Sequence, residues 1–336
     1  MEKLQFEKLL PRENLMAIEA GYGIDIVNIQ QLFTGADRNT FAYKVYTGEK
    51  ESLFLKTRTG SFDEASVEVP YLLSRSIGAH IIEPLRAADG SLYLKTGDYS
   101  VVLYPFISGR PAKQKALTKE QWVQFGEVLK KIHEFELPQN IKKIPRETYD
   151  GRWRAGLKKY MGELNNKERD NWYVKQFIGL YDQKSELIKF IINHAEGLLG
   201  RVKNAAQDFC LCHGDIHAGN ILIADNKEFY IVDWDTLIIA PKERDLMFIG
   251  GGVANTWNTK DEEDHFYAGY GRQEKVNQEM INYYRFERII VDLVEYFEQF
   301  FADNIEEKNQ KAIIERVGSV FYPDGVVDMA FREGAR

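Results

Sequence analysis

The stretch from residue 210 to residue 235 combines residue types that can handle phosphate and a divalent cation. Its first part reads Cys-Leu-Cys-His-Gly-Asp-Ile-His-Ala-Gly-Asn, and its last part reads Ile-Val-Asp-Trp-Asp. Asp215 stands five residues before Asn220, a spacing that leaves one carboxylate close to a metal ligand but free to orient an incoming hydroxyl. An aspartate with a pKa of about 4 is a weak base, but loose phosphoryl transfer needs little prior deprotonation. We therefore expect Asp215 to act mainly by positioning.

Two apolar runs in this stretch, 221–224 and 228–232, flank the turn-forming residues 225–227. This pattern predicts a β-hairpin, in which Asn220 and Asp233 lie at the same end. An amide oxygen and a carboxylate are hard ligands, so the pair predicts a Mg²⁺ site. Aspartate, asparagine and glycine are also common in plain turns. The combination of all these residues favours a catalytic loop over that reading.

The first third of the chain has the composition of a small sheet with one helix. The expected strands are 24–32, 41–46, 53–55, 91–95 and 101–104, and the expected helix is 63–77. Lys56 ends the third of these strands, where kinase-like folds place the lysine that holds the nucleotide phosphates. Glu64 or Glu68, four residues apart on the helix, is its expected partner. The turn before the second strand contributes Gly35, Asp37, Asn39 and Thr40 as candidate nucleotide contacts.

After Pro105 the apolar residues recur at helical spacing. Thr118 and Gln121 have the form of a capping box, and His133 follows the helix stripe as an expected core or capping histidine. Further helices are expected over 153–202 and 283–301. The change of pattern predicts an N-terminal β-rich nucleotide-binding lobe over residues 1–107 and a helical lobe with the catalytic loop over residues 108–336.

The composition is that of an ordinary globular protein and limits the classes of partner. The chain has 336 residues with 51 acidic and 44 basic side chains, a net charge of −7. That balance argues against nucleic acid and suits a cationic small-molecule substrate. Charged residues interrupt the apolar segment 281–301, so we expect no membrane span. The first twelve residues lack an apolar core of signal-peptide length, which predicts a cytoplasmic protein.

The two cysteines, Cys210 and Cys212, are separated by one residue and are poorly placed to bridge each other. A reducing compartment accords with this. A metal site based on them would need a second Cys or His pair, and the sequence has none at suitable spacing.

Residues 213–220 together with 231–235 resemble the aminoglycoside phosphotransferase and choline kinase family, and the resemblance covers nearly the whole chain. Residues 240–252 with 283–288 look most like its spectinomycin phosphotransferase branch. The resemblance implies an α+β, protein-kinase-like bilobal fold and the use of ATP, or GTP, with Mg²⁺. It implies that Asp215 is the catalytic base, that Asn220 and Asp233 bind magnesium and that Lys56 anchors phosphate. The implied hinge that meets adenine consists of Tyr104, Pro105, Phe106 and Ile107.

The resemblance also suggests an acceptor, the hydroxyl of spectinomycin or a related aminocyclitol or aminoglycoside antibiotic, which phosphorylation would inactivate. A kinase of an endogenous alcohol such as choline, homoserine or methylthioribose is the alternative, and an inactive nucleotide-binding scaffold is a third. The residues expected to line the substrate are Asp235, His217, Trp257, Glu287 and Asp292, for whose carboxylates surface salt bridges are the competing interpretation. Asp245, beside Arg244, is expected to cap the next helix and fix the substrate loop.

Overall fold

The structure, a computed structural model, describes most of the chain and divides it into two compact units. The described residues are 10–32, 39–49, 51–139, 141, 144–167, 171–204, 208–272, 275–302 and 305–334. Unit 1 consists of Met1–Lys115, Phe135–Ile144 and Asn220–Leu237, and unit 2 consists of Ala116–Glu134, Pro145–Gly219 and Ile238–Arg336. The predicted N-terminal lobe falls within unit 1, whereas the predicted C-terminal lobe is divided between both units.

Unit 1 contains a five-stranded antiparallel sheet with the order β1-β2-β3-β5-β4. Its strands are β1 (Ile26–Leu32), β2 (Thr40–Thr47), β3 (Ser52–Thr59), β4 (Leu94–Thr96) and β5 (Tyr99–Pro105). Side chains alternate along β3, so that Leu53, Leu55 and Thr57 are buried while Lys56 and Arg58 lie on the other face. The predicted meander is confirmed, but Lys56 lies within β3 rather than at its end. The strand continues because Thr57 is buried as a core-facing residue.

Two helices accompany this sheet. α3 (Ala65–Ile77) matches the predicted helix and ends before Gly78. α2 (Arg12–Tyr22) packs against β4 and was not predicted, although Pro11 at its start and Gly23, which ends it with φ of +65°, are typical boundary residues. Only one of its apolar residues, Ile18, is buried. Leu10 and Ile18 nevertheless join the apolar core of unit 1 with residues of β1, β2, β3 and β5.

The predicted hairpin is present in unit 1 as β8 (Ile221–Ala224) and β9 (Phe229–Ile231), and β6 (Gly109–Pro111) completes a three-stranded sheet of order β6-β8-β9. Ile221 pairs with Ile231, and the N–H of Ala224 donates to the carbonyl of Glu228 over 2.8 Å. This is the register that the turn residues predicted.

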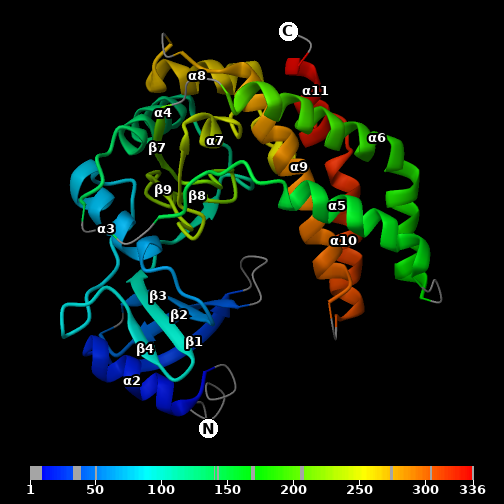
Figure 1. Ribbon diagram of the computed structural model, residues 1–336. Coiled ribbons are helices and arrows are strands. Elements are labelled where there is room, and N and C mark those ends of the chain that lie inside the picture. Colours follow the sequence, from blue (N-terminus) through cyan, green and yellow to red (C-terminus); the bar gives the residue numbers. More distant parts are fainter. Residues whose placement is uncertain are drawn as a thin grey trace. The chain divides into compact units, whose positions relative to one another are not determined.

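Unit 2 is mainly helical. Its helices are α4 (Lys119–His133), α5 (Arg152–Glu163), α6 (Trp172–Val202), α7 (Glu243–Leu246), α8 (Lys260–Tyr270), α9 (Gln278–Phe300), α10 (Glu307–Val320) and α11 (Val326–Gly334), with short 3₁₀ helices at Leu164–Asn166 and Val253–Asn255. α9 packs against α5, α6, α10 and α11 (Figure 1). Strands β7 (Phe209–Cys212) and β10 (Ile238–Pro241) form an antiparallel pair. Thr118 and Gln121 form the predicted capping box at the start of α4.

Among the described residues no helix combines the length and the apolar character needed to cross a membrane. The charges on α9 account for this, since Arg285, Glu287 and Arg288 interrupt its apolar residues.

Candidate active site

Asn220 and Asp233 lie at the same end of the β8–β9 hairpin in unit 1. The N–H of Val232 donates to the carbonyl of Asn220 over 3.0 Å, which continues the β8–β9 ladder by one pair. Asp233 follows directly with a φ of +67°, in the left-handed region that short polar side chains tolerate best after glycine. This turn ends the strand at Asp233. The carboxylate of Asp233 is about half exposed, at 51%.

Lys56 on β3 contacts both aspartates of the segment 233–235. Its Nζ lies 3.0 Å from Oδ1 of Asp233 and 2.8 Å from Oδ1 of Asp235. Burial opposes the charge of Lys56, but the two carboxylates outweigh it and raise the pKa of its ammonium group above the ordinary value. Pairing of Lys56 with Glu64 or Glu68 stays a prediction, and the two aspartates are partners that sequence reasoning did not assign to it. The sequence could not show that the loop after β9 packs on β3.

Arg58, two residues further along the same face of β3, is a site residue that sequence reasoning missed. Its Nη1 lies 3.2 Å from Oδ2 of Asp235 and donates to Oγ1 of Thr40 over 3.4 Å. Asp235 is therefore held between Lys56 and Arg58. The signal available in the sequence was the spacing of two, which puts both cations on one face of the strand.

Residues near Asp235 also line a pocket within unit 1. The pocket has a volume of about 310 Å³ and is lined by Arg58, Ser61, Phe62, Asp63, Ser66 and Asp235. The ion pair between Arg58 and Asp235 forms part of this lining.

The other residues predicted to contact the nucleotide lie in the turn before β2 and in the expected hinge. Gly35 and Asp37 lie outside the described residues. Asn39 accepts a hydrogen bond from the N–H of Thr59 at its carbonyl. In the expected hinge, Tyr104 and Pro105 belong to β5, and the N–H of Phe106 donates to the carbonyl of Ser52 over 3.1 Å. Adenine contacts at Tyr104 to Ile107 stay a prediction, and the N–H of Phe106 is already used by the protein.

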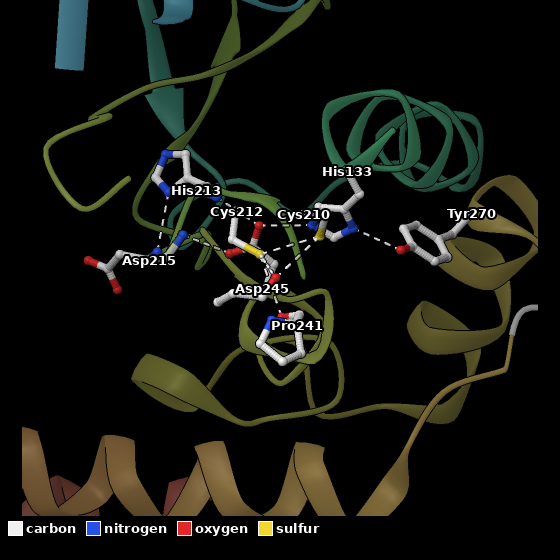
Figure 2. Close-up of polar contacts among 10 residues, drawn as sticks. His133, Cys210, Cys212, His213, Asp215, Pro241, Asp245 and Tyr270 are labelled. Carbon is white, nitrogen blue, oxygen red and sulfur yellow. Dashed lines mark hydrogen bonds and ion pairs between the residues drawn. The ribbon is translucent and has the colours of Figure 1, made fainter. Parts of the chain in front are cut away.

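The loop that carries Asp215 follows β7 in unit 2 and is held by Asp245. The backbone N–H of His213 donates to Oδ2 of Asp245 over 2.8 Å, and that of Gly214 donates to Oδ1 over 2.7 Å (Figure 2). Gly214 has a φ of +84°, a conformation that favours glycine. Asp245 lies inside α7 and is fully buried, so it does not cap the next helix as expected. Its position within the helix directs it to the loop that precedes Asp215.

A buried histidine completes this support. Nε2 of His133 lies 3.0 Å from Oδ2 of Asp245, and its Nδ1 lies 2.8 Å from the hydroxyl of Tyr270 (Figure 2). Burial opposes ionisation of both groups, but their contact lowers the pKa of Asp245 and raises that of His133. His133 is a hydrogen-bonded core residue, which confirms the expectation from its helix position.

The carboxylate of Asp215 lies in an ionic cluster with α9. Arg288 donates from Nη1 to Oδ1 of Asp215 and from Nε to Oδ1 of Asp292, the latter over 2.8 Å. Nε2 of His217 lies 3.6 Å from Oδ2 of Asp215. Burial raises the pKa of Asp215, but the charges of Arg288 and His217 more than offset this and lower it. The group is therefore an ionised hydrogen-bond acceptor near neutral pH.

Comparison with known proteins shows the family of the chain. A family model described as the phosphotransferase enzyme family, APH, matches residues 40–287. The chain belongs to this phosphotransferase family. The crystal structure of spectinomycin phosphotransferase APH(9)-Ia in complex with ADP and spectinomycin is 33% identical, with a TM-score of 0.89 over 97% of this chain and 98% of that one.

Other members of the phosphotransferase family are more distant. Protein StrN of Streptomyces griseus is 21% identical over 74% of each chain. The choline kinase LicA of Streptococcus pneumoniae is 15% identical, with a TM-score of 0.56 over 98% of each chain, and supports the fold alone. The predicted α+β protein-kinase-like fold is confirmed by these neighbours.

Two residues predicted to line the substrate of this phosphotransferase are buried in unit 2 and contact other side chains there. Trp257 is buried, with its ring centroid 5.0 Å from that of Trp122, in an aromatic cluster that covers α4. Glu287 is buried and forms an ion pair with Arg154. Burial raises the pKa of Glu287, although Arg154 opposes this. Both side chains are engaged inside the protein, because they lie on the inward face of their segments.

His217 and Asp292 do lie beside Asp215, but through protein contacts that sequence reasoning could not supply. Nδ1 of His217 accepts from the N–H of Gly219 over 2.8 Å, so the imidazole stabilises the loop. Arg288 is the site residue that was missed. The available signal was an arginine between Glu287 and Ile289 on a helix with an apolar face, where a cation close to the core needs an acidic partner.

Proposed function

We propose that this phosphotransferase uses Mg²⁺ and ATP to phosphorylate a hydroxyl group of spectinomycin or a closely related aminocyclitol antibiotic. The observation that carries the proposal is the similarity to APH(9)-Ia, whose crystal structures contain ADP with spectinomycin, and AMP. That similarity extends over 97% of the chain at 33% identity. The cationic character of an aminocyclitol also suits a protein with a net charge of −7.

In this proposal the residues of unit 1 hold the nucleotide phosphates. Asn220 and Asp233 offer an amide and a carboxylate oxygen at the same end of the hairpin, and such hard donors fit Mg²⁺. A bound Mg²⁺ neutralises charge on the phosphate oxygens. Lys56 carries a firmly held positive charge between Asp233 and Asp235, which suits it to bind phosphate oxygens.

In unit 2 the role of Asp215 is to orient the acceptor hydroxyl. As the hydroxyl oxygen forms its bond to the γ-phosphorus, the bond from that phosphorus to the β–γ bridging oxygen breaks, and ADP leaves with that electron pair. The hydroxyl proton passes to the Asp215 carboxylate. Asp245 supports this geometry because it fixes the backbone at His213 and Gly214, directly before Asp215.

Arg288 tunes the same carboxylate. Its guanidinium group holds Oδ1 of Asp215, which leaves Oδ2 as the oxygen not bonded to Arg288. The positive charge lowers the basicity of Asp215 and keeps it ionised. The arrangement therefore favours a positioning acceptor over a strong base, as a loose transition state requires.

The test is ATP consumption with Mg²⁺ against separate acceptors, with the product identified by mass spectrometry. The panel contains spectinomycin, other aminoglycosides, choline, homoserine and methylthioribose, and each is repeated with GTP. We expect a phosphorylated product with spectinomycin and none with choline. Phosphorylation of an endogenous alcohol alone would refute the antibiotic substrate, and no turnover with any acceptor would favour an inactive scaffold. The Asp215→Asn variant serves as the control for background hydrolysis.

A further inference from the structure

A second group of metal-ligating side chains lies in unit 2, on the far side of Asp245 from the carboxylate of Asp215 (Figure 2). Cys210 and Cys212 are both free, and their side chains share one face of β7 because they are two residues apart. His133 of α4 joins them. One donor atom from each of the three residues lies within 4.8 Å of the other two. The sequence has no second Cys or His pair at suitable spacing, and the fold supplies the third ligand from 77 positions earlier than Cys210.

The distance between the two sulfurs distinguishes among the possible uses of the pair. The Sγ atoms of Cys210 and Cys212 are 3.8 Å apart. Two thiolates bound to one tetrahedral zinc at Zn–S distances of about 2.3 Å are separated by roughly 3.8 Å. A disulfide instead requires about 2.05 Å, and residues two apart on an extended strand have Cα atoms near the upper limit for a bridge. The geometry thus suits a shared metal better than a covalent bond.

We propose that Cys210, Cys212 and His133 form a binding site for a soft or borderline divalent metal ion such as Zn²⁺. Thiolate and imidazole ligands prefer such ions, whereas the amide and carboxylate oxygens of Asn220 and Asp233 suit Mg²⁺. The two sites therefore select different metals. Two thiolates also balance the charge of a dication, which lowers the cost of burying it.

The three ligands have protein partners that a metal must compete with. Sγ of Cys210 lies 3.5 Å from the carbonyl oxygen of Ala240, and Sγ of Cys212 lies 3.6 Å from the same oxygen. Thiols are weak donors, and metal binding releases their protons. The hydrogen bond from Cys212 lowers the pKa of Cys210, whereas burial raises that of Cys212, so binding of the metal must drive the release of the Cys212 proton.

His133 must exchange one of its two hydrogen bonds, since one nitrogen faces Asp245 and the other faces Tyr270. The hydrogen bond that His133 keeps fixes the orientation of its ring. Residues that hydrogen-bond the second nitrogen of metal-bound histidines act in the same way. Because Asp245 also holds His213 and Gly214, the metal site adjoins the support of the catalytic loop. An effect of the metal on turnover would rest on the proposed function, but binding of the metal does not.

The experiment is a titration of the reduced, chelator-treated full-length protein with Co²⁺, a spectroscopic substitute for Zn²⁺. We expect one bound ion with thiolate-to-cobalt charge-transfer absorption and the strong visible bands of tetrahedral coordination. The chain has only two cysteines, so a thiolate signal reports on this pair. Competition with Zn²⁺ should abolish the signal and give the affinity for zinc.

Three variants define the ligands. Cys210→Ser, at a half-buried position, should remove the charge-transfer band or weaken metal binding strongly. Loss of a residue that only hydrogen-bonds a metal ligand weakens binding by about 10- to 100-fold, and loss of a ligand should weaken it more. His133→Gln should also weaken binding, whereas His265→Gln on α8 should leave it unchanged. Absence of a thiolate band, a band unchanged in Cys210→Ser, or dependence on His265 would each overturn the proposal. None of these readouts requires an active kinase.

Discussion

The carboxylate of Asp215 is held by a cation that comes from a distant helix. Arg288, 73 residues later in the sequence, bonds both Asp215 and Asp292. Burial raises the pKa of Asp292, although the positive charge of Arg288 opposes this shift. Of the two carboxylates, only that of Asp215 has a lowered pKa. Arg288 bonds both aspartates, so the difference also reflects the charge of His217 beside Asp215 and that of Asp215 near Asp292.

Replacement of Arg288 should shift the pH dependence of the reaction. Because Arg288 lowers the pKa of Asp215, the Arg288→Ala substitution should raise that pKa. As the pH falls, Asp215 should then become protonated, and activity should be lost, at a higher pH than in the unmodified enzyme. We expect the acid limb of the kcat/KM profile to move upward in pH. Arg288→Lys, which keeps the positive charge, should leave the limb close to its original position. An acid limb unchanged in Arg288→Ala would contradict control of Asp215 by Arg288.

Asp215 itself is expected to affect turnover rather than nucleotide binding. Asp215→Asn keeps the size of the side chain but removes the proton acceptor, and kcat should fall by roughly 10² to 10⁴, the usual range for a positioned acid–base group. Calorimetry should show the same affinity for Mg²⁺ and ATP as in the unmodified protein. A kcat within a factor of about two of normal would remove Asp215 from its proposed role, because a loss of even 10² was expected.

At this scale the sequence predicts residues that follow one another closely and misses those brought in by folding. Asp215, Asn220 and Asp233 could be selected because their spacing and the hairpin turn constrain them. Arg58 was missed although it shares the face of Lys56. Arg288 and His133 come from separate helices, and only tertiary packing places them beside the loop.

Among the elements, the hairpin was the most predictable because a turn sequence fixes its register. The third strand of its sheet, β6, has three residues and pairs through Arg110 with Ile223, which a sequence pattern cannot reveal at that length. α2 was missed although Leu15, Ile18 and Tyr22 recur at helical spacing, and of these only Ile18 is buried. Strongly periodic or turn-bounded elements were predictable, whereas short elements that depend on a partner were not.

The close approach of α4 and α8 provides a test of packing at the same scale. A Cβ atom added at Gly269 would lie 1.8 Å from the carbonyl oxygen of Val123, so Gly269→Ala must displace backbone. We expect it to lower the free energy of unfolding by about 1 to 3 kcal/mol. Gly197→Ala, on an exposed helical position of α6 with no atom within 4 Å, should instead be neutral or stabilise by up to about 1 kcal/mol.

Urea denaturation of both variants measures the difference directly. If Gly269→Ala unfolds at the same urea concentration as the unmodified protein, the contact between α4 and α8 is looser than the structure has it. The control guards against a general effect of alanine on helix propensity, since both substitutions place alanine in a helix.

For the whole molecule, the two units are interleaved along the chain. Residues 220–237 belong to unit 1, although the segments before and after them belong to unit 2. The sequence predicted a single boundary near residue 107 because the apolar period changes there from strand to helix. Such periodicity reports on local structure, whereas membership of a unit depends on contacts between segments more than a hundred residues apart.

Nucleotide binding should stabilise the folded chain and should depend on Lys56. A ligand at 100 times its Kd adds about 2.7 kcal/mol to the free energy of unfolding when it binds only the folded state. We expect a non-hydrolysable ATP analogue with Mg²⁺ to raise Tm accordingly and to do so less without Mg²⁺. Lys56→Met should remove most of the shift, because its ammonium group is the proposed phosphate contact on β3.

Lys95→Met is the matched control, since Lys95 is an exposed lysine on β4 of the same sheet. It should keep the full nucleotide-induced shift. Lys56→Met also leaves Asp233 and Asp235 without their ammonium partner, so its Tm without nucleotide will change as well. The comparison must therefore be made between shifts and not between absolute Tm values. An equal shift in both variants would show that Lys56 does not bind the phosphates, whereas its selective loss in Lys56→Met would support nucleotide binding on this face of β3.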